Sequence, residues 1–108
     1  MDKYIVVVTL CDKEEVANKI IETLLTKKLV AGSQVSKVYS KYWWDNELEE
    51  CEEYKLEFRT KSDHFGEIKK EIKKIHNYEV AEISYYEIAN ANGDFLHWID
   101  ESIKNIDD

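Results

Sequence analysis

The chain alternates between short apolar runs and amphipathic stretches, and this pattern predicts its elements in turn. Residues 4–8 read Tyr-Ile-Val-Val-Val, an apolar run typical of a central strand buried on both faces. Asp12 and Glu15 then stand in capping-box spacing, so we expect a helix to begin at Asp12 and to end near Lys27 and Lys28. Its apolar stripe recurs at the helical period in Val16, Ala17, Ile20, Ile21 and Leu24.

Residues 30–44 predict a long second strand that is rich in aromatic and β-branched side chains. Val35 and Val38 cannot share a face at strict period two, so we expect a β-bulge or a bend between them. Asp45-Asn46 predicts a hairpin turn, because Asn tolerates positive φ. The return strand alternates apolar with charged residues, which indicates one buried and one solvent-exposed face. The alternating residues are Tyr54, Lys55, Leu56, Glu57, Phe58 and Arg59.

A second amphipathic helix is predicted from Ser62 or Asp63 to His76. Its apolar stripe is Phe65, Ile68, Ile72 and Ile75. Residues 78–89 predict a last long strand, and Asp94 is expected to cap a short C-terminal helix.

This order of elements predicts an α+β fold in a single domain over residues 1–108. It is the ferredoxin-like βαββαβ arrangement, an antiparallel sheet with two helices on one face, extended by a C-terminal helix. The long strands carry aromatic bulk on both faces, in Tyr42, Trp43, Trp44, Tyr85 and Tyr86. Because the two helices cover only one face, we expect self-association to cover the other.

Composition excludes several classes of function. The net charge of −8, from 23 acidic against 15 basic residues, repels phosphate backbones, so we expect no nucleic-acid binding. No apolar run approaches the roughly 18–20 residues that span a bilayer, and no targeting segment precedes the first strand, so we expect no membrane association and a cytoplasmic location. Cys11 and Cys51 fit neither a zinc ribbon nor a redox pair and are expected to stay reduced.

Most of the candidate functional side chains lie at residues 76–83, between the second predicted helix and the last predicted strand. His76 is either a metal ligand or proton shuttle, or a ring hydrogen-bonded at the corner. Glu82 is about 20 Å further along an extended chain, so the two meet within one chain only if the corner folds back. Glu79 is nearer, and Tyr78 either donates to a carboxylate or anchors the strand.

Other candidates are more scattered. Arg59 either holds an anion or pairs with Glu82, and we favour the pair. Trp44 and Trp98 suit packing better than ligand stacking. Cys11 precedes a helix, which can lower a thiol pKa, and is therefore the better candidate for a reactive or metal-binding thiol. Three features are expected to be solvated: the acidic run around Cys51 (Glu49, Glu50, Glu52 and Glu53), His64 and His97.

Several blocks, in order and over nearly the whole length, resemble the CutA family of divalent-cation tolerance proteins. They are Glu14-Glu15-x-Ala17, Leu29-Val30-Ala31, Tyr42-Trp43-Trp44-x-x-x-Leu48-Glu49, Glu53 through Arg59-Thr60, His76-Asn77-Tyr78-Glu79-Val80-Ala81-Glu82-Ile83 and Phe95-Leu96-x-Trp98-Ile99. Asn77 and Ala81 replace the two prolines of the family's signature. Gly32 replaces a cysteine that many members carry, which removes a soft ligand and weakens the case for copper(I).

The resemblance implies a cytosolic homotrimer whose long strands join sheets between subunits, with a link to tolerance of copper and other divalent cations. We therefore expect a non-enzymatic trimer that binds copper or another divalent cation weakly and does not need it for folding. The expected metal ligands are His76, Glu82 and Cys11. The expected cleft residues are Trp44, Arg59, Tyr78, Glu79 and Trp98.

Two alternatives remain open at the level of sequence. The first is a PII-like trimeric signalling module that binds a small molecule in clefts between subunits. The second is a structural trimer that scaffolds a partner. Catalysis is not expected, because the sequence has no nucleophile elbow, no Gly-rich phosphate loop and no His-Glu-x-x-His.

Overall fold

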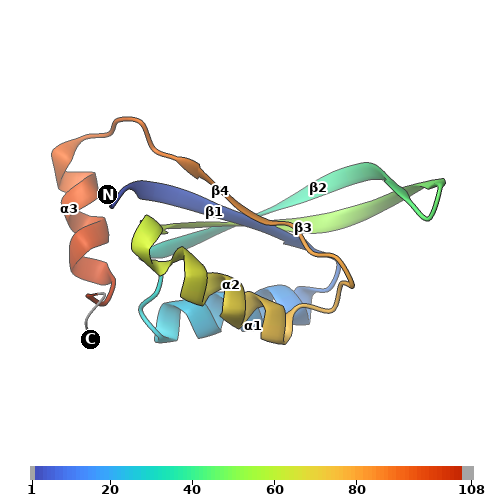
Figure 1. Cartoon of the computed structure of the whole chain (residues 1–108), viewed down its shortest axis with the longest axis horizontal. Helices are drawn as coiled ribbons and strands as arrows, with labels where there is room; N and C mark the ends of the chain where they lie inside the picture. Colours follow the sequence, from blue (N-terminus) through green and yellow to red (C-terminus); the bar gives the residue numbers. More distant parts are fainter. Residues whose placement is uncertain (1, 106–108) are drawn as a thin grey trace.

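A computed structural model describes residues 2–105, and its elements follow the expected order (Figure 1). The strands are β1 (Tyr4–Cys11), β2 (Gly32–Trp44), β3 (Glu47–Lys61) and β4 (Ile83–Glu87). The helices are α1 (Glu14–Thr26), a 3₁₀ turn (Ser62–His64) that leads into α2 (Phe65–Ile75), and α3 (Gly93–Ser102). The strands form one antiparallel sheet in the order β2-β3-β1-β4, which confirms the ferredoxin-like prediction. Among residues 2–105, no helix has the length and apolar character that a membrane span requires.

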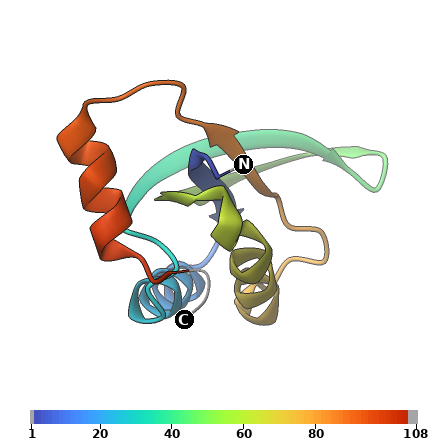
Figure 2. The ribbon, with the colours of Figure 1, turned by 60° about the vertical axis from the view of Figure 1, so that its left-hand side comes forward.

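Helices α1 and α2 lie along one face of the sheet, and the main core lies between them and the strands (Figures 1 and 2). The fully buried core side chains include Ile5, Val7, Ile20, Leu24, Leu56, Phe58, Ile68 and Ile72. Each such side chain stabilises the fold by about 1.5–3 kcal/mol through leaving water. The alternation predicted for β3 is confirmed, because Leu56 and Phe58 are buried while Lys55 and Glu57 are partly exposed.

The face opposite α1 and α2, here called the open face, is less bare than the sequence suggests. Val6 and Val8 of β1 point to this face, yet they are only 3% and 6% exposed. The hydroxyl of Tyr86 in β4 donates a hydrogen bond of 2.8 Å to Glu57 in β3, which raises the pKa of Tyr86. Because β1 runs between β4 and β3, this bridge passes above β1 and shields its valines.

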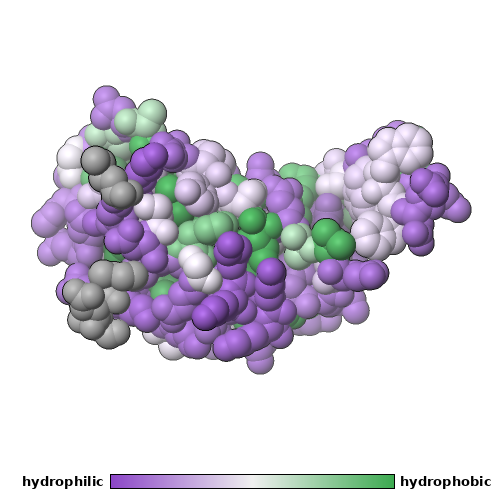
Figure 3. All heavy atoms as spheres, in the orientation of Figure 1, coloured by the Kyte–Doolittle hydropathy of each residue, from purple (hydrophilic) through white to green (hydrophobic). Residues whose placement is uncertain are grey.

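Beyond the helices, β2 and β3 continue as a two-stranded ribbon that projects from the body (Figures 1 and 3). Asp45 and Asn46 both adopt positive φ, at 54° and 64°, which confirms the predicted tight turn. Of the two alternatives expected between Val35 and Val38, the β-bulge is wrong, because pairing is continuous from Gly32 opposite Arg59 to Trp44 opposite Glu47. No helix covers the ribbon, so Val35 and Val38 do not need to share a buried face.

Several predicted boundaries are wrong. Helix α1 starts at Glu14, and its N-cap residue is Lys13, which makes no side-chain capping hydrogen bond. The predicted capping box of Asp12 and Glu15 therefore does not form. Asn92, and not Asp94, occupies the N-cap of α3, while the Asp94 carboxylate accepts hydrogen bonds from the Phe95 amide and the Asn92 side chain. The last strand is shorter than expected, because β1 offers partners only to residues 83–87.

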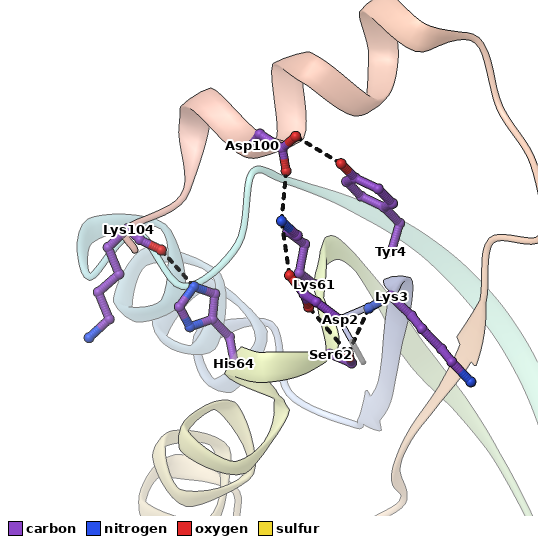
Figure 4. Close-up of polar contacts among 8 residues, drawn as sticks. All are labelled: Asp2, Lys3, Tyr4, Lys61, Ser62, His64, Asp100 and Lys104. Carbon is purple, nitrogen blue, oxygen red and sulfur yellow. Dashed lines mark hydrogen bonds and ion pairs between the residues drawn. The ribbon is translucent and has the colours of Figure 1, made fainter. Parts of the chain in front are cut away.

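Helix α3 lies at the end of the sheet opposite the ribbon, where polar contacts hold it in place (Figures 1 and 4). The Asp100 carboxylate accepts a hydrogen bond of 2.8 Å from the Tyr4 hydroxyl and pairs with Lys61 at 3.0 Å. Lys61 also pairs with Asp2 at 2.9 Å. After α3, the chain returns to His64, whose Nε2 lies 2.7 Å from the Lys104 carbonyl oxygen. His64 is buried, so its expected surface position is wrong.

Candidate functional site

A groove of about 770 Å³ lies between the base of the ribbon and residues 77–82. Its aromatic lining consists of Tyr42, Trp43, Trp44 and Tyr78. Its charged lining consists of Lys41, Glu53, Glu79 and Glu82, and the remaining walls are Leu10, Ser40, Asn77 and Val80. The groove therefore brings together four of the residues predicted from the sequence, namely Trp44, Tyr78, Glu79 and Glu82.

Glu53 is the buried carboxylate of the groove. It is 6% exposed and accepts a hydrogen bond of 2.7 Å from the Tyr78 hydroxyl. Burial, followed by this hydrogen bond, raises the pKa of Tyr78, so the phenol stays protonated and acts as a donor. Within residues 2–105, no lysine or arginine forms an ion pair with Glu53. Over the same residues, the carboxylate is therefore stabilised by a hydrogen bond from a neutral hydroxyl and not by a paired cation.

His76 ends α2 and fixes the position of Tyr78 through hydrogen bonds at both ring nitrogens. Nδ1 accepts the Tyr78 amide N–H at 3.1 Å, and Nε2 lies 2.6 Å from the carbonyl oxygen of Leu10. A nitrogen that accepts a hydrogen bond from an amide carries no proton, so Nε2 carries the ring proton and its N–H donates a hydrogen bond to the carbonyl oxygen. The imidazole and phenol rings also lie against each other, with centroids 4.7 Å apart. This geometry matches the prediction of a hydrogen-bonded corner.

Glu82 lies on the far wall, just before β4. Its backbone carbonyl accepts a hydrogen bond from the Thr9 hydroxyl at 2.7 Å, and its carboxylate accepts one from Ser84 at 2.7 Å. Within residues 2–105, no three His, Cys, Asp or Glu side chains come close enough together to hold a metal ion. A single chain therefore does not present a complete set of metal ligands.

Four predicted site residues are absent from the lining of the groove: His76, which holds its corner, and Cys11, Arg59 and Trp98. Cys11 is fully buried, and burial raises the pKa of its thiol, so the low pKa expected from the nearby helix is wrong. Arg59 lies on the open face, so the favoured pair with Glu82 is wrong, and its buried Nη1 has no hydrogen-bond partner among residues 2–105. Trp98 belongs to α3, where it stacks on Phe95 with ring centroids 5.8 Å apart.

Sequence reasoning missed Glu53, Tyr42, Trp43 and Lys41 as groove residues. The acidic pattern around Cys51 predicts that Glu53 is solvated, and its burial shows that this prediction is wrong for Glu53. Its burial depends on Tyr78, which is 25 residues away in the chain, and local pattern carries no signal of such a contact. For Tyr42 and Trp43 a signal existed, because both adjoin Trp44 on the same predicted strand.

Comparisons with known proteins agree on one family. A profile described as CutA1 divalent ion tolerance protein matches residues 5–102. The chain is similar to the divalent-cation tolerance protein CutA of Pyrococcus horikoshii, with 33% identity over 100 residues that cover 93% of this chain and 98% of that one. The crystal structure of CutA1 from Pyrococcus horikoshii matches with a TM-score of 0.88 and 32% identity, covering 94% of this chain and 99% of that chain.

A second solved structure is relevant to the cellular location of the protein. The periplasmic divalent cation tolerance protein CutA from Archaeoglobus fulgidus matches with a TM-score of 0.88 and 31% identity, covering 96% of this chain and 100% of that chain. That relative is described as periplasmic, whereas the sequence of this chain predicts a cytoplasmic location. The compartment of this chain stays a prediction.

Proposed function

Because the chain belongs to the CutA1 family, we propose that it is a non-enzymatic divalent-cation tolerance protein that binds copper or another divalent ion weakly. The observation that supports this proposal is the groove, where Glu53, Glu79 and Glu82 gather beside the corner held by His76. Carboxylate and imidazole groups suit copper(II) and similar divalent ions. The buried thiol of Cys11 takes no part in this proposal.

The expected affinity is low for two structural reasons. First, residues 2–105 of one chain offer no group of three ligands, so water or a neighbouring chain must supply the remaining donors. Second, both ring nitrogens of His76 already have partners, so a metal at Nδ1 must displace the amide of Tyr78. Each substitution of a hydrogen bond by a metal bond lowers the net gain from binding.

We also propose that the protein works as a homotrimer, as its family resemblance implies. The support from the structure is one face of the ribbon, whose large side chains stay exposed in a single chain: Val35, Tyr39, Trp43 and Leu48. Exposed apolar surface of this kind marks an association site. A neighbouring chain that packs on the ribbon would also stand beside the groove.

Copper titration calorimetry on three single variants tests the metal site. We expect His76→Ala to weaken copper(II) binding by at least about tenfold, and Glu82→Gln by a smaller factor. His97→Ala is the matched control, because His97 is an exposed histidine on α3 that pairs only with Glu101 among residues 2–105. Equal affinity in His76→Ala and the native chain would eliminate His76 as a ligand, and the absence of saturable binding in the native chain would reject the metal site itself.

The groove also supports the second candidate, a signalling module that binds a small molecule. Its volume of about 770 Å³ lies within the range of known ligand pockets, about 300–1,000 Å³. Thermal-shift screening separates the two candidates. Stabilisation by metabolites but not by metals would favour the small-molecule function.

A further inference from the structure

We propose that the groove binds a small organic ammonium ion, held between the aromatic side chains of the ribbon and the carboxylate of Glu53. This inference deepens the proposal that the groove is the ligand site, and it names the chemical class of the ligand. It does not depend on metal binding. Its test is therefore separate from the copper titration.

The aromatic walls supply the first part of the recognition. Tyr42 and Trp44 are two residues apart on β2, so they point to the same face of the ribbon, and each is 40% exposed. Their pairing partners in β3 are Glu49 and Glu47, which places them on the same face as Glu53. Tyr78 closes the groove from the opposite side. The faces of Trp and Tyr rings attract ammonium groups, and Trp does so most strongly.

The charges of the groove favour a cation. Glu53 is buried, and among the described residues the partner of its carboxylate is a neutral hydroxyl, which is a costly arrangement for a carboxylate. Glu79 and Glu82 add negative charge at the opposite wall. Lys41 is the basic residue of the lining, but its ammonium group pairs with Glu50 at 2.9 Å. A cationic ligand would therefore supply the counter-charge that Glu53 lacks.

The shape of the groove favours an organic cation over a bare metal ion as its main occupant. Aromatic carbon atoms do not coordinate divalent metals, yet they make up much of the lining. The groove is also far larger than a metal ion, and within residues 2–105 no three ligands converge on a point. A quaternary or alkyl ammonium group combines a positive charge with an apolar surface, and this groove offers a partner to both.

A pair of probes isolates the charge of the ligand. Choline carries a quaternary nitrogen, and 3,3-dimethylbutan-1-ol has nearly the same shape with a neutral carbon in its place. We expect choline to bind saturably, with at least about tenfold higher affinity than the neutral analogue. Two-dimensional NMR of the indole N–H groups reports the location, because choline should shift the signal of Trp44 and leave that of Trp98 unchanged.

Matched variants locate the groups responsible. Glu53→Gln removes the charge but keeps an acceptor for Tyr78, and we expect it to weaken choline binding by at least about tenfold. Its control is Glu52→Gln, which changes an exposed neighbour on the opposite face of β3. Trp44→Leu should weaken binding severalfold, whereas Trp98→Leu should not change it.

Three results would overturn the inference: no saturable choline binding to the native chain, equal binding of the neutral analogue, or unchanged choline affinity in Glu53→Gln. Each of these results would overturn the inference regardless of the outcome of the copper titration. If copper binds and choline does not, the metal-site proposal survives and this inference fails. If choline binds and copper does not, the reverse is true.

Discussion

Gly32 is a residue of β2 on which the Trp98 ring of α3 lies closely. A Cβ atom at this position would lie 3.0 Å from the end of the Trp98 ring, which is tighter than ordinary carbon contact. The glycine therefore lets the indole lie directly on the start of β2. Trp98 is 44% exposed, so its ring has room to shift by the few tenths of an ångström that an added methyl group requires.

We expect Gly32→Ala to change stability little, because the gain from removing a strand glycine offsets the tight contact, to within about 0.5 kcal/mol. Gly32→Val should cost about 1–3 kcal/mol, because its branched side chain must displace the indole. Urea unfolding at fixed protein concentration measures both effects. The double variant Gly32→Val with Trp98→Leu should recover part of the loss, and equal costs with and without Trp98 would contradict this account.

At the scale of elements, α3 depends on a carboxylate whose protonation should loosen it. Burial alone would raise the pKa of Asp100, but hydrogen bonds from Tyr4 and Lys61 outweigh burial and hold its pKa below the usual range. A carboxyl group with a lowered pKa in the folded chain stabilises that chain above its unfolded pKa of about 4, and the stabilisation is lost as the pH falls through the folded pKa.

We expect Asp100→Asn to destabilise the protein at pH 7 by less than about 1 kcal/mol, because solvent screens the exposed pair. The difference from the native chain should shrink as the pH falls from 7 towards 2, because Asp100 is progressively protonated, first in the unfolded chain and at lower pH in the folded chain. Urea unfolding at the two pH values measures this. Glu101→Gln is the control on the same helix, since Glu101 pairs only with exposed His97 among residues 2–105. A difference that persists unchanged at pH 2 would show that Asp100 acts through packing.

The same scale shows what the sequence could predict. The stripe of α2 and the alternation of β3 reflect contact with one continuous core, so their hydrophobic patterns predicted both elements correctly. The segment before β4 follows no such rule, because hydrogen bonds of His76, Tyr78 and Thr9 to distant parts of the chain determine its path. The groove is built from this segment. Its aromatic wall and outer carboxylates were therefore predictable as candidates, but its buried carboxylate was not.

At the scale of the whole molecule, the described chain is elongated, with extents of 44 × 27 × 23 Å, because the ribbon reaches beyond the helices. One face of the ribbon carries a run of exposed side chains at alternating spacing. Val35, Tyr39 and Trp43 lie on the same face, and Leu48 joins them because it pairs with Trp43. Trp43 is 71% exposed, which is costly for the largest apolar side chain unless another chain covers it.

A change on the ribbon should therefore act on assembly and leave the fold of each chain intact. We expect native mass spectrometry to give the mass of three chains for the native protein. Trp43→Glu and Leu48→Glu should shift the population towards single chains, because each places a charge where a neighbour would bury it. Leu25→Glu is the control, since Leu25 is an exposed leucine on α1, away from the ribbon. Circular dichroism should show the same secondary structure in all four proteins, since no core residue changes. A native protein that remains a single chain at micromolar concentration would reject the trimer, and the exposed ribbon would then need a different partner.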